Sequence, residues 1–282
     1  HNSININDPA GPETASGMGK DGFYHDYQAG YFGNVTFSYA PVQAYTKWGV
    51  ELYKHDLGPV IWPQTAFLSP DGKRVADGYK HPHSHPSCLQ AEDPKDGKKY
   101  LYVFANISST RDDKNTMVGA ARAPMESRGL PGNYLSFYKG DYREQSLPSN
   151  MNEDVSTLLT RKGGKADAIH PELYSINRFF VTRLKRSGLF LSVESYSEGQ
   201  EIVTALRLSE DLRSWTGRFE IPNSRVSRRR EDRMVPPFGM YYPKFLSRDG
   251  SSHYEMDEAE PFYIIAAKPH SLVYRELSIE IG

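Results

Sequence analysis

The chain has 282 residues, of which 38% are hydrophobic, and this is enough for one folded domain over residues 1–282 with a sizeable core. Its 34 lysines and arginines nearly balance its 35 aspartates and glutamates, so a net charge of −1 excludes long-range attraction to nucleic acid or to an anionic membrane. We therefore expect neither nucleic acid nor a lipid surface as a partner.

Cysteine usage argues against redox chemistry, and the chain start fits a processed protein. The single cysteine, Cys88, excludes an internal disulfide and a thiol-rich zinc site, and we expect a free thiol packed as a small apolar residue. No apolar run approaches the ~18 residues that a membrane helix requires. The chain begins at His1 rather than Met, and sequons at Asn34 and Asn106 fit an extracellular protein. We expect a secreted, extracellular or periplasmic monomer with no membrane span, no metal and no other cofactor.

Strand signals dominate the pattern along the chain. Short runs of β-branched and aromatic residues at 100–105, 189–193, 262–266 and 272–281 predict strands. Residues 152–159 are the best candidate for a helix, of one or two turns. Because 23 glycines and 19 prolines interrupt the pattern, long helices are excluded and the chain is predicted to be all-β.

A dipeptide of an aromatic residue or histidine followed by proline recurs before apolar stretches, at Trp62-Pro63, His85-Pro86, His170-Pro171 and Tyr242-Pro243. The second and third are followed by similar elements. The predicted strands are 87–91, 99–106, 116–123 and 134–142 in one unit, and 172–184, 188–196, 201–208 and 215–221 in the next. Four antiparallel strands per unit are typical of a propeller blade. We expect a five-bladed β-propeller, with six blades or a β-sandwich as alternatives, and with each dipeptide opening an inner strand at similar depth.

Two motifs resemble stretches of known enzymes. Residues 117–123, Met-Val-Gly-Ala-Ala-Arg-Ala, together with the strand 134–142, and the turn 209–215, Ser-Glu-Asp-Leu-Arg-Ser-Trp, are similar to segments of the five-bladed propeller glycoside hydrolases of families 43 and 32. This resemblance implies a propeller and hydrolysis of a glycosidic bond in an axial pocket. Those families place an Asp on the first inner strand, a second Asp in the next blade and a Glu in the third.

The carboxylates that the resemblance implies are matched only in part. Asp8, before Pro9, is similar to the first acid, and Glu172, after His170-Pro171, takes the place of the third. After His85-Pro86 the chain has Ser87-Cys88 instead of an acid, so either Glu92 replaces it or the site lacks that acid.

Glycoside hydrolysis needs two carboxyl groups on either side of the scissile bond. The candidate catalytic residues are Glu172, Glu194 and Asp8. Aromatic rings match the apolar faces of sugars and imidazoles bind hydroxyls, so the expected carbohydrate contacts are Trp62, His85, His170, Tyr174, Tyr242 and Glu92. The alternating His81, His83 and His85 also fit a metal site, although Pro82 and Pro86 argue against a regular strand there.

Two other functions remain open. A polysaccharide lyase would abstract a proton with His85, His170 or Tyr242 and leave an unsaturated uronate. A non-catalytic carbohydrate-binding propeller would keep the aromatic pocket and lack the carboxylate pair, as the missing acid after His85-Pro86 suggests.

Overall fold

A computed structural model of the chain describes residues 2–5, 31–39, 55–61, 83–108, 116–127, 129, 132–147, 161–169, 175–227, 241–268 and 271–280. In several strands, including residues 83–86, 175–178 and 241–242, it describes the backbone alone.

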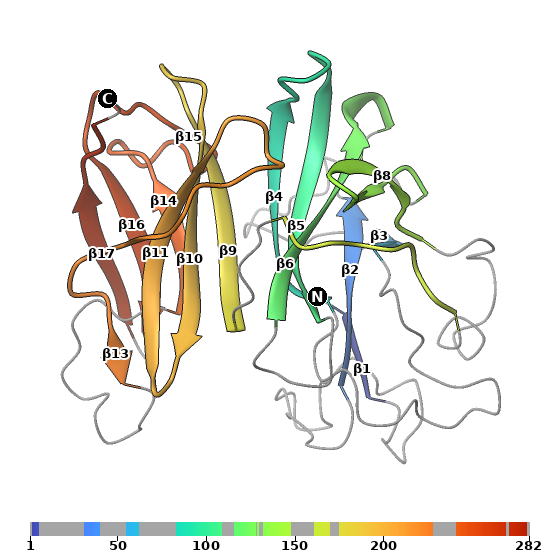
Figure 1. Cartoon of the computed structure of the whole chain (residues 1–282), viewed down its shortest axis with the longest axis horizontal. Coiled ribbons are helices and arrows are strands. Elements are labelled where there is room, and N and C mark those ends of the chain that lie inside the picture. Colours follow the sequence, from blue (N-terminus) through green and yellow to red (C-terminus); the bar gives the residue numbers. More distant parts are fainter. Residues whose placement is uncertain are drawn as a thin grey trace, which may run out of the picture.

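The described residues form four sheets (Figure 1), antiparallel except for one short parallel pairing in the third, and this confirms the all-β class. The first sheet contains β1 (Asn2–Asn5), β2 (Tyr31–Tyr39) and β3 (His55–Ile61). The second contains β4 (His83–Glu92), β5 (Lys99–Ser108), β6 (Thr116–Pro124), β7 (Leu135–Tyr138) and β8 (Asp141–Gln145), and a single 3₁₀ turn, Met125–Ser127, follows β6. The third contains β9 (Ser175–Leu184), β10 (Phe190–Glu198), β11 (Glu201–Ser209), β12 (Phe219–Glu220) and β13 (Val226–Ser227). The fourth contains β14 (Tyr241–Leu246), β16 (Phe262–Lys268) and β17 (Ser271–Leu277).

One segment predicted as a single strand contains two strands in the structure. The segment 134–142 is a hairpin of β7 and β8, because Lys139 and Gly140 both have positive φ, at 50° and 77°. Two consecutive residues with positive φ make the tight turn that matches the twist of paired strands. The predicted helical turn at 152–159 lies outside the described residues. In the part of the chain that the structure describes, no helix combines the length and the apolarity that crossing a membrane requires.

One strand from each sheet contacts a strand of the next sheet in chain order; in the first sheet it is the middle strand, β2, and in the other three it is the first strand along the chain. β2 packs against β4, β4 against β9, and β9 against β14. The arrows of β2, β4 and β17 in Figure 1 point the same way, and β14 shares the direction of β17 because both are antiparallel to β16. β9 is antiparallel to β10, whose arrow points the opposite way. β2, β4, β9 and β14 therefore all begin at the same end of the molecule.

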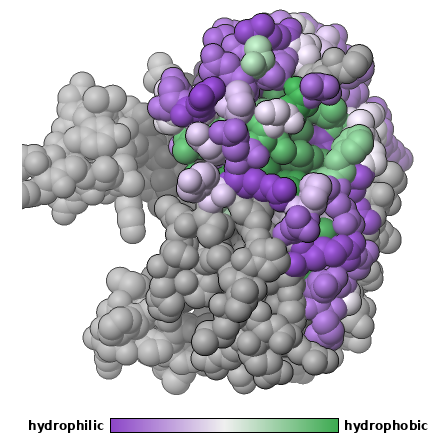
Figure 2. Space-filling model, turned by 90° about the vertical axis from the view of Figure 1, so that its left-hand side faces the viewer, coloured by the Kyte–Doolittle hydropathy of each residue, from purple (hydrophilic) through white to green (hydrophobic). Residues whose placement is uncertain are grey.

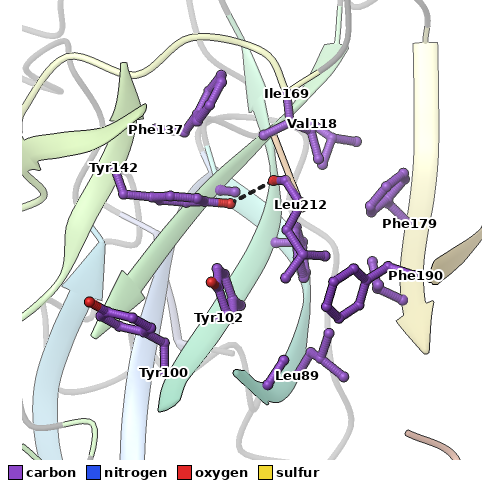
Figure 3. Packing of buried hydrophobic residues seen from close by; sticks show 14 of the residues in the cluster. Leu89, Tyr100, Tyr102, Val118, Phe137, Tyr142, Ile169, Phe179, Phe190 and Leu212 are labelled. Atoms are coloured by element: carbon purple, nitrogen blue, oxygen red, sulfur yellow. Dashed lines mark hydrogen bonds between the residues drawn. The ribbon is translucent and has the colours of Figure 1, made fainter. Parts of the chain in front are cut away.

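Aromatic side chains fill the two layers on either side of β9. Phe179 faces the layer toward the second sheet, where Tyr102, Phe104 and Tyr196 are buried (Figure 3). Its neighbour Phe180 faces the other layer, with Phe245 and Phe262 of the fourth sheet. Successive residues of a strand point to opposite faces, so β9 contributes to both cores at once.

The outer side of the fourth sheet is partly apolar. Figure 2 shows this side of the molecule, where hydrophobic residues gather in one area among hydrophilic ones. Tyr263 and Tyr274 make an edge-to-face ring contact at 5.7 Å between centroids, and Tyr274 is 74% exposed. Among the described sheets, only the third therefore covers the fourth.

A short strand in the connection between β14 and β16 of the fourth sheet extends the third sheet. β15 (Glu255–Met256) pairs in parallel with the end of β9, at Arg183 and Leu184. The turn after β9 is held by the same connection, since the carboxylate of Glu258 accepts hydrogen bonds from the backbone N–H of Arg186 at 3.0 Å. The third and fourth sheets are thus joined by backbone bonds as well as by their core.

Three first strands carry a β-bulge close to their beginning. In β4 the pairing passes from Ser84 with Asn106 to Ser87 with Phe104, so His85 and Pro86 together oppose one residue. In β14 the pairing passes from Tyr241 with Ala267 to Lys244 with Ile265, so Tyr242 and Pro243 do the same. In β9 the extra residue is Asn177, between Ile176, which pairs with Tyr196, and Arg178, which pairs with Ser195.

Two of the four dipeptides lie at equivalent places in the strand pairing. Proline lacks the N–H that a ladder requires and is tolerated at bulges, so His85-Pro86 and Tyr242-Pro243 occupy equivalent places. His170-Pro171 lies outside the described residues, before β9, whose own bulge is at Asn177. Trp62-Pro63 follows the end of β3, and these residues lie outside the described part.

Candidate functional site

Most of the predicted site residues lie where the structure gives no description. Asp8, Trp62, His170, Glu172 and Tyr174 are all outside the described residues. The backbones of His85 and Tyr242 are described, and so are the side chains of Glu92 and Glu194.

Contacts just beyond the bulges hold the three first strands side by side. The buried hydroxyl of Ser87, next to Pro86, donates a 2.7 Å hydrogen bond to the carbonyl oxygen of Phe179, two residues after Asn177. On the other face of β9, the ring of Phe180 lies 6.4 Å from that of Phe245 and 5.8 Å from the ammonium of Lys244. Lys244 directly follows Pro243. The three bulges therefore lie at the same level, and we call this region the bulge end.

Glu92 lies at the opposite end of β4 from His85. It is the last residue of the strand, its side chain is exposed, and it pairs with Lys99. Seven residues at 3.3 Å each separate it from His85 by roughly 20 Å. The structure does not bring Glu92 to the bulge end, where it was expected to replace a missing acid.

Glu194 is buried in an ion pair. Its side chain has 0% exposure, and its two oxygens accept hydrogen bonds from Nε of Arg207 at 3.2 and 3.1 Å. Arg207 also donates to the carbonyl oxygen of Thr216 at 2.9 Å. A general acid must carry a proton, whereas a guanidinium in contact stabilises the ionised carboxylate. This geometry supports a structural role, and the catalytic role of Glu194 stays a prediction.

Two arginines of the enzyme-like motifs meet at a buried aspartate that sequence reasoning missed. Asp93 is fully buried and forms ion pairs with Arg122, from the motif 117–123, and with Arg213, from the turn 209–215. The two outer nitrogens of Arg213 bind its two oxygens at 3.1 and 2.8 Å. The hydroxyl of Tyr102 donates to the same carboxylate at 2.8 Å. We call Asp93, Tyr102, Arg122, Arg213 and Asp141 the Asp93 cluster.

Asp141 extends the cluster to the surface. It accepts hydrogen bonds from Nε of Arg213 at 3.0 Å and from the ammonium of Lys95 at 2.6 Å. The guanidinium of Arg122 stacks 3.8 Å above the ring of Tyr100. Both acids thus remain paired, and the second and third sheets are tied together through Arg213.

Burial alone would raise the pKa of Asp93, but hydrogen bonds from Arg213, the Lys95 backbone and Tyr102, together with the charge of Arg122, outweigh it and hold the pKa below its ordinary value. Burial also disfavours the ionised form of Asp141. The hydrogen bonds from Lys95 and Arg213 outweigh burial and hold the pKa of Asp141 well below its ordinary value. Carboxylates kept ionised in this way do not serve as proton donors near neutral pH. The motifs therefore mark a connection between sheets.

The turn 209–215 is built to present Arg213. The hydroxyl oxygen of Ser209 accepts a hydrogen bond from the backbone N–H of Leu212 at 2.9 Å, and Asp211 accepts those of Arg213 and Ser214 at 2.8 and 2.7 Å. Leu212 has a φ of 57°, and its carbonyl oxygen accepts a bond from the Tyr142 hydroxyl at 2.9 Å (Figure 3).

The other side chains among the described residues that could bind a metal or react do not gather in one place. No group of three or more His, Cys, Asp or Glu side chains there could hold a metal ion. Cys88 is a free thiol, but it is exposed, because it alternates on β4 with the buried Ser87 and Leu89; its predicted packing is wrong.

An open cleft of about 500 Å³ lies at the far end of β9, between Lys185, Asp249 and Phe262. Hydrogen bonds from Ser247 and Ser251 lower the pKa of Asp249 to about 2, and a bond from Arg186 lowers the pKa of Asp257. These acids of the cleft are already engaged by groups of the protein.

Comparisons with known proteins give little similarity. No family model matches the chain, and no curated protein resembles it significantly. A solved structure, named "putative glycoside hydrolase" from Parabacteroides distasonis, is similar over 74% of this chain, with 12% identity and a TM-score of 0.38. The chain spans about half of that protein, 52% of its length. A similarity at this level assigns neither a family nor an activity.

Replacing Asp93 tests the connection between the sheets. Asp93→Asn leaves Arg122 and Arg213 buried with a neutral partner, and we expect the free energy of unfolding in urea to fall by about 3–5 kcal/mol. Asp257→Asn is the matched control, since its pair with Arg186 is exposed and its loss costs less than about 1 kcal/mol. Equal effects of the two substitutions would contradict this role of Asp93.

The same cluster predicts sensitivity to acid. The pKa values of Asp93 and Asp141 lie below those of the unfolded chain, so the unfolded state takes up protons first as the pH falls. Their stabilisation is complete above a pH of about 4 and is lost below it. Urea midpoints measured from pH 6 to pH 2.5 should fall more steeply for the parent than for Asp93→Asn. Parallel pH profiles would show that Asp93 does not contribute.

Replacing Glu194 separates a structural from a catalytic role. Glu194→Gln should destabilise the protein by about 3–5 kcal/mol, because Arg207 keeps its buried charge. The double variant Glu194→Leu, Arg207→Met should recover most of that loss, since it removes both charges. Thermal and urea unfolding provide the measurement. A Glu194→Gln protein of normal stability that no longer cleaves a glycan would instead favour catalysis.

Proposed function

We propose that the chain is a β-propeller that hydrolyses glycosidic bonds in a pocket at the bulge end. The observation that supports this most is the order of four strands, one from each sheet: β2, β4, β9 and β14 contact one another in chain order and begin at the same end. The inner strands of propeller blades are arranged in this way around an axis. The motif resemblance to propeller glycoside hydrolases agrees with the same architecture.

The position of the predicted residues along the chain favours the bulge end as the site. Glu172 comes three residues before β9, and Asp8 lies in the segment before β2. His85 and Tyr242 are bulge residues of β4 and β14. Bulges are frequent next to active sites, because they turn a strand and redirect a side chain. Loops carried by a rigid scaffold are also where catalytic residues concentrate.

In the proposed reaction, Glu172 is the general acid and Asp8 is its partner carboxylate. Glu172 donates its proton to the glycosidic oxygen as the bond between that oxygen and the anomeric carbon breaks. Asp8 either takes a proton from the water that attacks this carbon, which inverts the configuration, or attacks the carbon itself to form a glycosyl ester. In the second case water, which gives a proton to the now ionised Glu172, displaces Asp8 from the carbon, and the two successive displacements retain the configuration. Trp62, His170 and Tyr174 are proposed contacts to the sugar, and the protein is proposed to act outside the cytoplasm as a monomer.

One observation favours a second candidate, a propeller that binds carbohydrate without cleaving it. The residue after His85-Pro86 is Ser87, and its buried hydroxyl is already bound to the Phe179 carbonyl oxygen. It cannot replace the acid that the resemblance implies in this blade.

Substituting Glu172 tests the hydrolase. Glu172→Gln keeps the shape of the side chain and removes its proton, so kcat should fall by about 100-fold or more with little change in melting temperature or glycan affinity. Reducing-end release from a panel of oligosaccharides gives the measurement. Glu210→Gln, an exposed acid of the turn 209–215, is the matched control and should cleave like the parent.

Three results would count against this proposal. Cleavage by Glu172→Gln at the parental rate would exclude Glu172 as the acid. Binding by the parent without any product would favour the non-catalytic propeller. Products with an unsaturated, ultraviolet-absorbing uronate would identify a lyase.

A further inference from the structure

We propose that the cleft at the far end of β9 is a second carbohydrate site, which holds a neutral oligosaccharide by its hydroxyl groups. This inference goes beyond the proposed function, because the cleft lies at the opposite end of β9 from the bulge end and contains none of the residues proposed for catalysis. The observation behind it is a set of charged side chains of both signs that line one cleft and have no partner among the described residues.

The cleft lies between the turns that follow β9, β14 and β15, and hydrogen bonds within the protein fix its walls. In the turn after β14, the carboxylate of Asp249 accepts bonds from the hydroxyls of Ser247 and Ser251, both at 2.7 Å. In the turn after β9, the backbone N–H of Lys185 donates to the carbonyl oxygen of Met256 at 2.9 Å. The walls are therefore formed before a ligand arrives, and binding would order little of the backbone.

Four charged side chains on these walls are left for a ligand. Lys185 and Arg248 carry the positive charges, and Glu255 and Glu260 carry the negative ones. All four are exposed, and in the described part of the chain none of them forms a hydrogen bond or an ion pair through its side chain. The other acids of the cleft are already held by groups of the protein. The open groups thus comprise two cations and two anions.

This mixture of signs defines the class of ligand. An anion would be attracted by Lys185 and Arg248 but repelled by the two glutamates, and for a cation the reverse holds. A sugar hydroxyl carries no charge, and it can donate to a carboxylate as well as accept from an ammonium or a guanidinium. A neutral oligosaccharide can therefore use all four groups at once.

The lining also excludes ligands that bind through apolar groups. Pro261 and Phe262 are the only apolar residues among those that line the cleft, and Phe262 is 1% exposed. A lipid tail or an apolar peptide side chain would find little surface to bury there. The volume of about 500 Å³ is typical of sites for small molecules. Because no aromatic ring is available for stacking on a sugar, we expect a weak site, with a Kd on the order of 1 mM.

The measurement is a titration of the isotope-labelled protein with neutral tetrasaccharides of glucose, galactose, mannose and xylose, followed through the chemical shifts of the backbone amides. The Glu172→Gln protein is used so that no ligand is consumed. We expect the amides of Arg248 and Glu260 to shift with the concentration of at least one sugar. A ligand at the bulge end would instead shift the amides of Ser87 and Phe179, so the two sites are read separately.

Substitutions test the charged groups. Arg248→Ala and Glu255→Ala should each weaken binding at the cleft by about 10-fold, through the loss of one charge-assisted hydrogen bond. Arg143→Ala and Glu210→Ala are the matched controls, since both residues are exposed and neither lines the cleft. They should bind like the background. Because all four positions are on the surface, the unfolding midpoints should stay close to that of the background.

Each other outcome overturns a defined part. If the tetrasaccharides shift only amides at the bulge end, the cleft is not a site and the proposed function stands. If they shift only amides of the cleft, the second site stands and the proposed position of the first is wrong. If an oligouronate or the zwitterion glycylglycine shifts the amides of Arg248 and Glu260 and no neutral sugar does, the class of ligand is wrong. Unchanged affinity of both cleft variants would show that these charges do not bind the sugar. If no sugar shifts any amide, both proposals fail.

Discussion

The arrangement of the second and third sheets depends on one buried carboxylate. Asp93 follows the last residue of β4 and accepts a bond from the backbone N–H of Lys95, so it also shapes the turn into β5. Arg122 reaches it from β6, and Arg213 reaches it from the third sheet. An anion with no exposure is tolerated only when its lone pairs are filled, and here four residues donate to it. If either sheet moved, Asp93 and Arg213 would separate, and each would keep a buried charge without its partner.

This ionic cluster and the bulges lie at opposite ends of the same strands. β4 carries His85-Pro86 near its beginning and is followed by Asp93 at its end. Between them the two layers of aromatic side chains on either side of β9 fix the spacing of the sheets. Such a division separates the bulges from the ion pairs of the Asp93 cluster, so loops at the bulge end can vary without loss of those ion pairs.

The sequence pattern predicts the strands and part of the site for physical reasons. Alternating apolar residues require a buried face, and Pro86 and Pro243 can lie in a strand only where the ladder is broken. In β9 the bulge lies at Asn177 without a proline, so a pattern of an aromatic residue or histidine before proline does not locate it. The partners of Asp93 lie 29 and 120 residues away, and no local pattern predicts such pairs. Glu194 looked available for catalysis because strand alternation does not show that Arg207 faces it across the hairpin.

The parallel pairing of β15 with β9 has a consequence for how the chain is made. The backbone N–H of Arg183 binds the carbonyl oxygen of Tyr254 at 2.8 Å, and that of Lys185 binds Met256 at 2.9 Å. Both acceptors are synthesised about 70 residues after β9, which corresponds to several seconds of translation. Until then the end of β9 presents an open strand edge, a template for pairing with another chain. The third sheet therefore completes its hydrogen bonding only when the connection within the fourth sheet has been made.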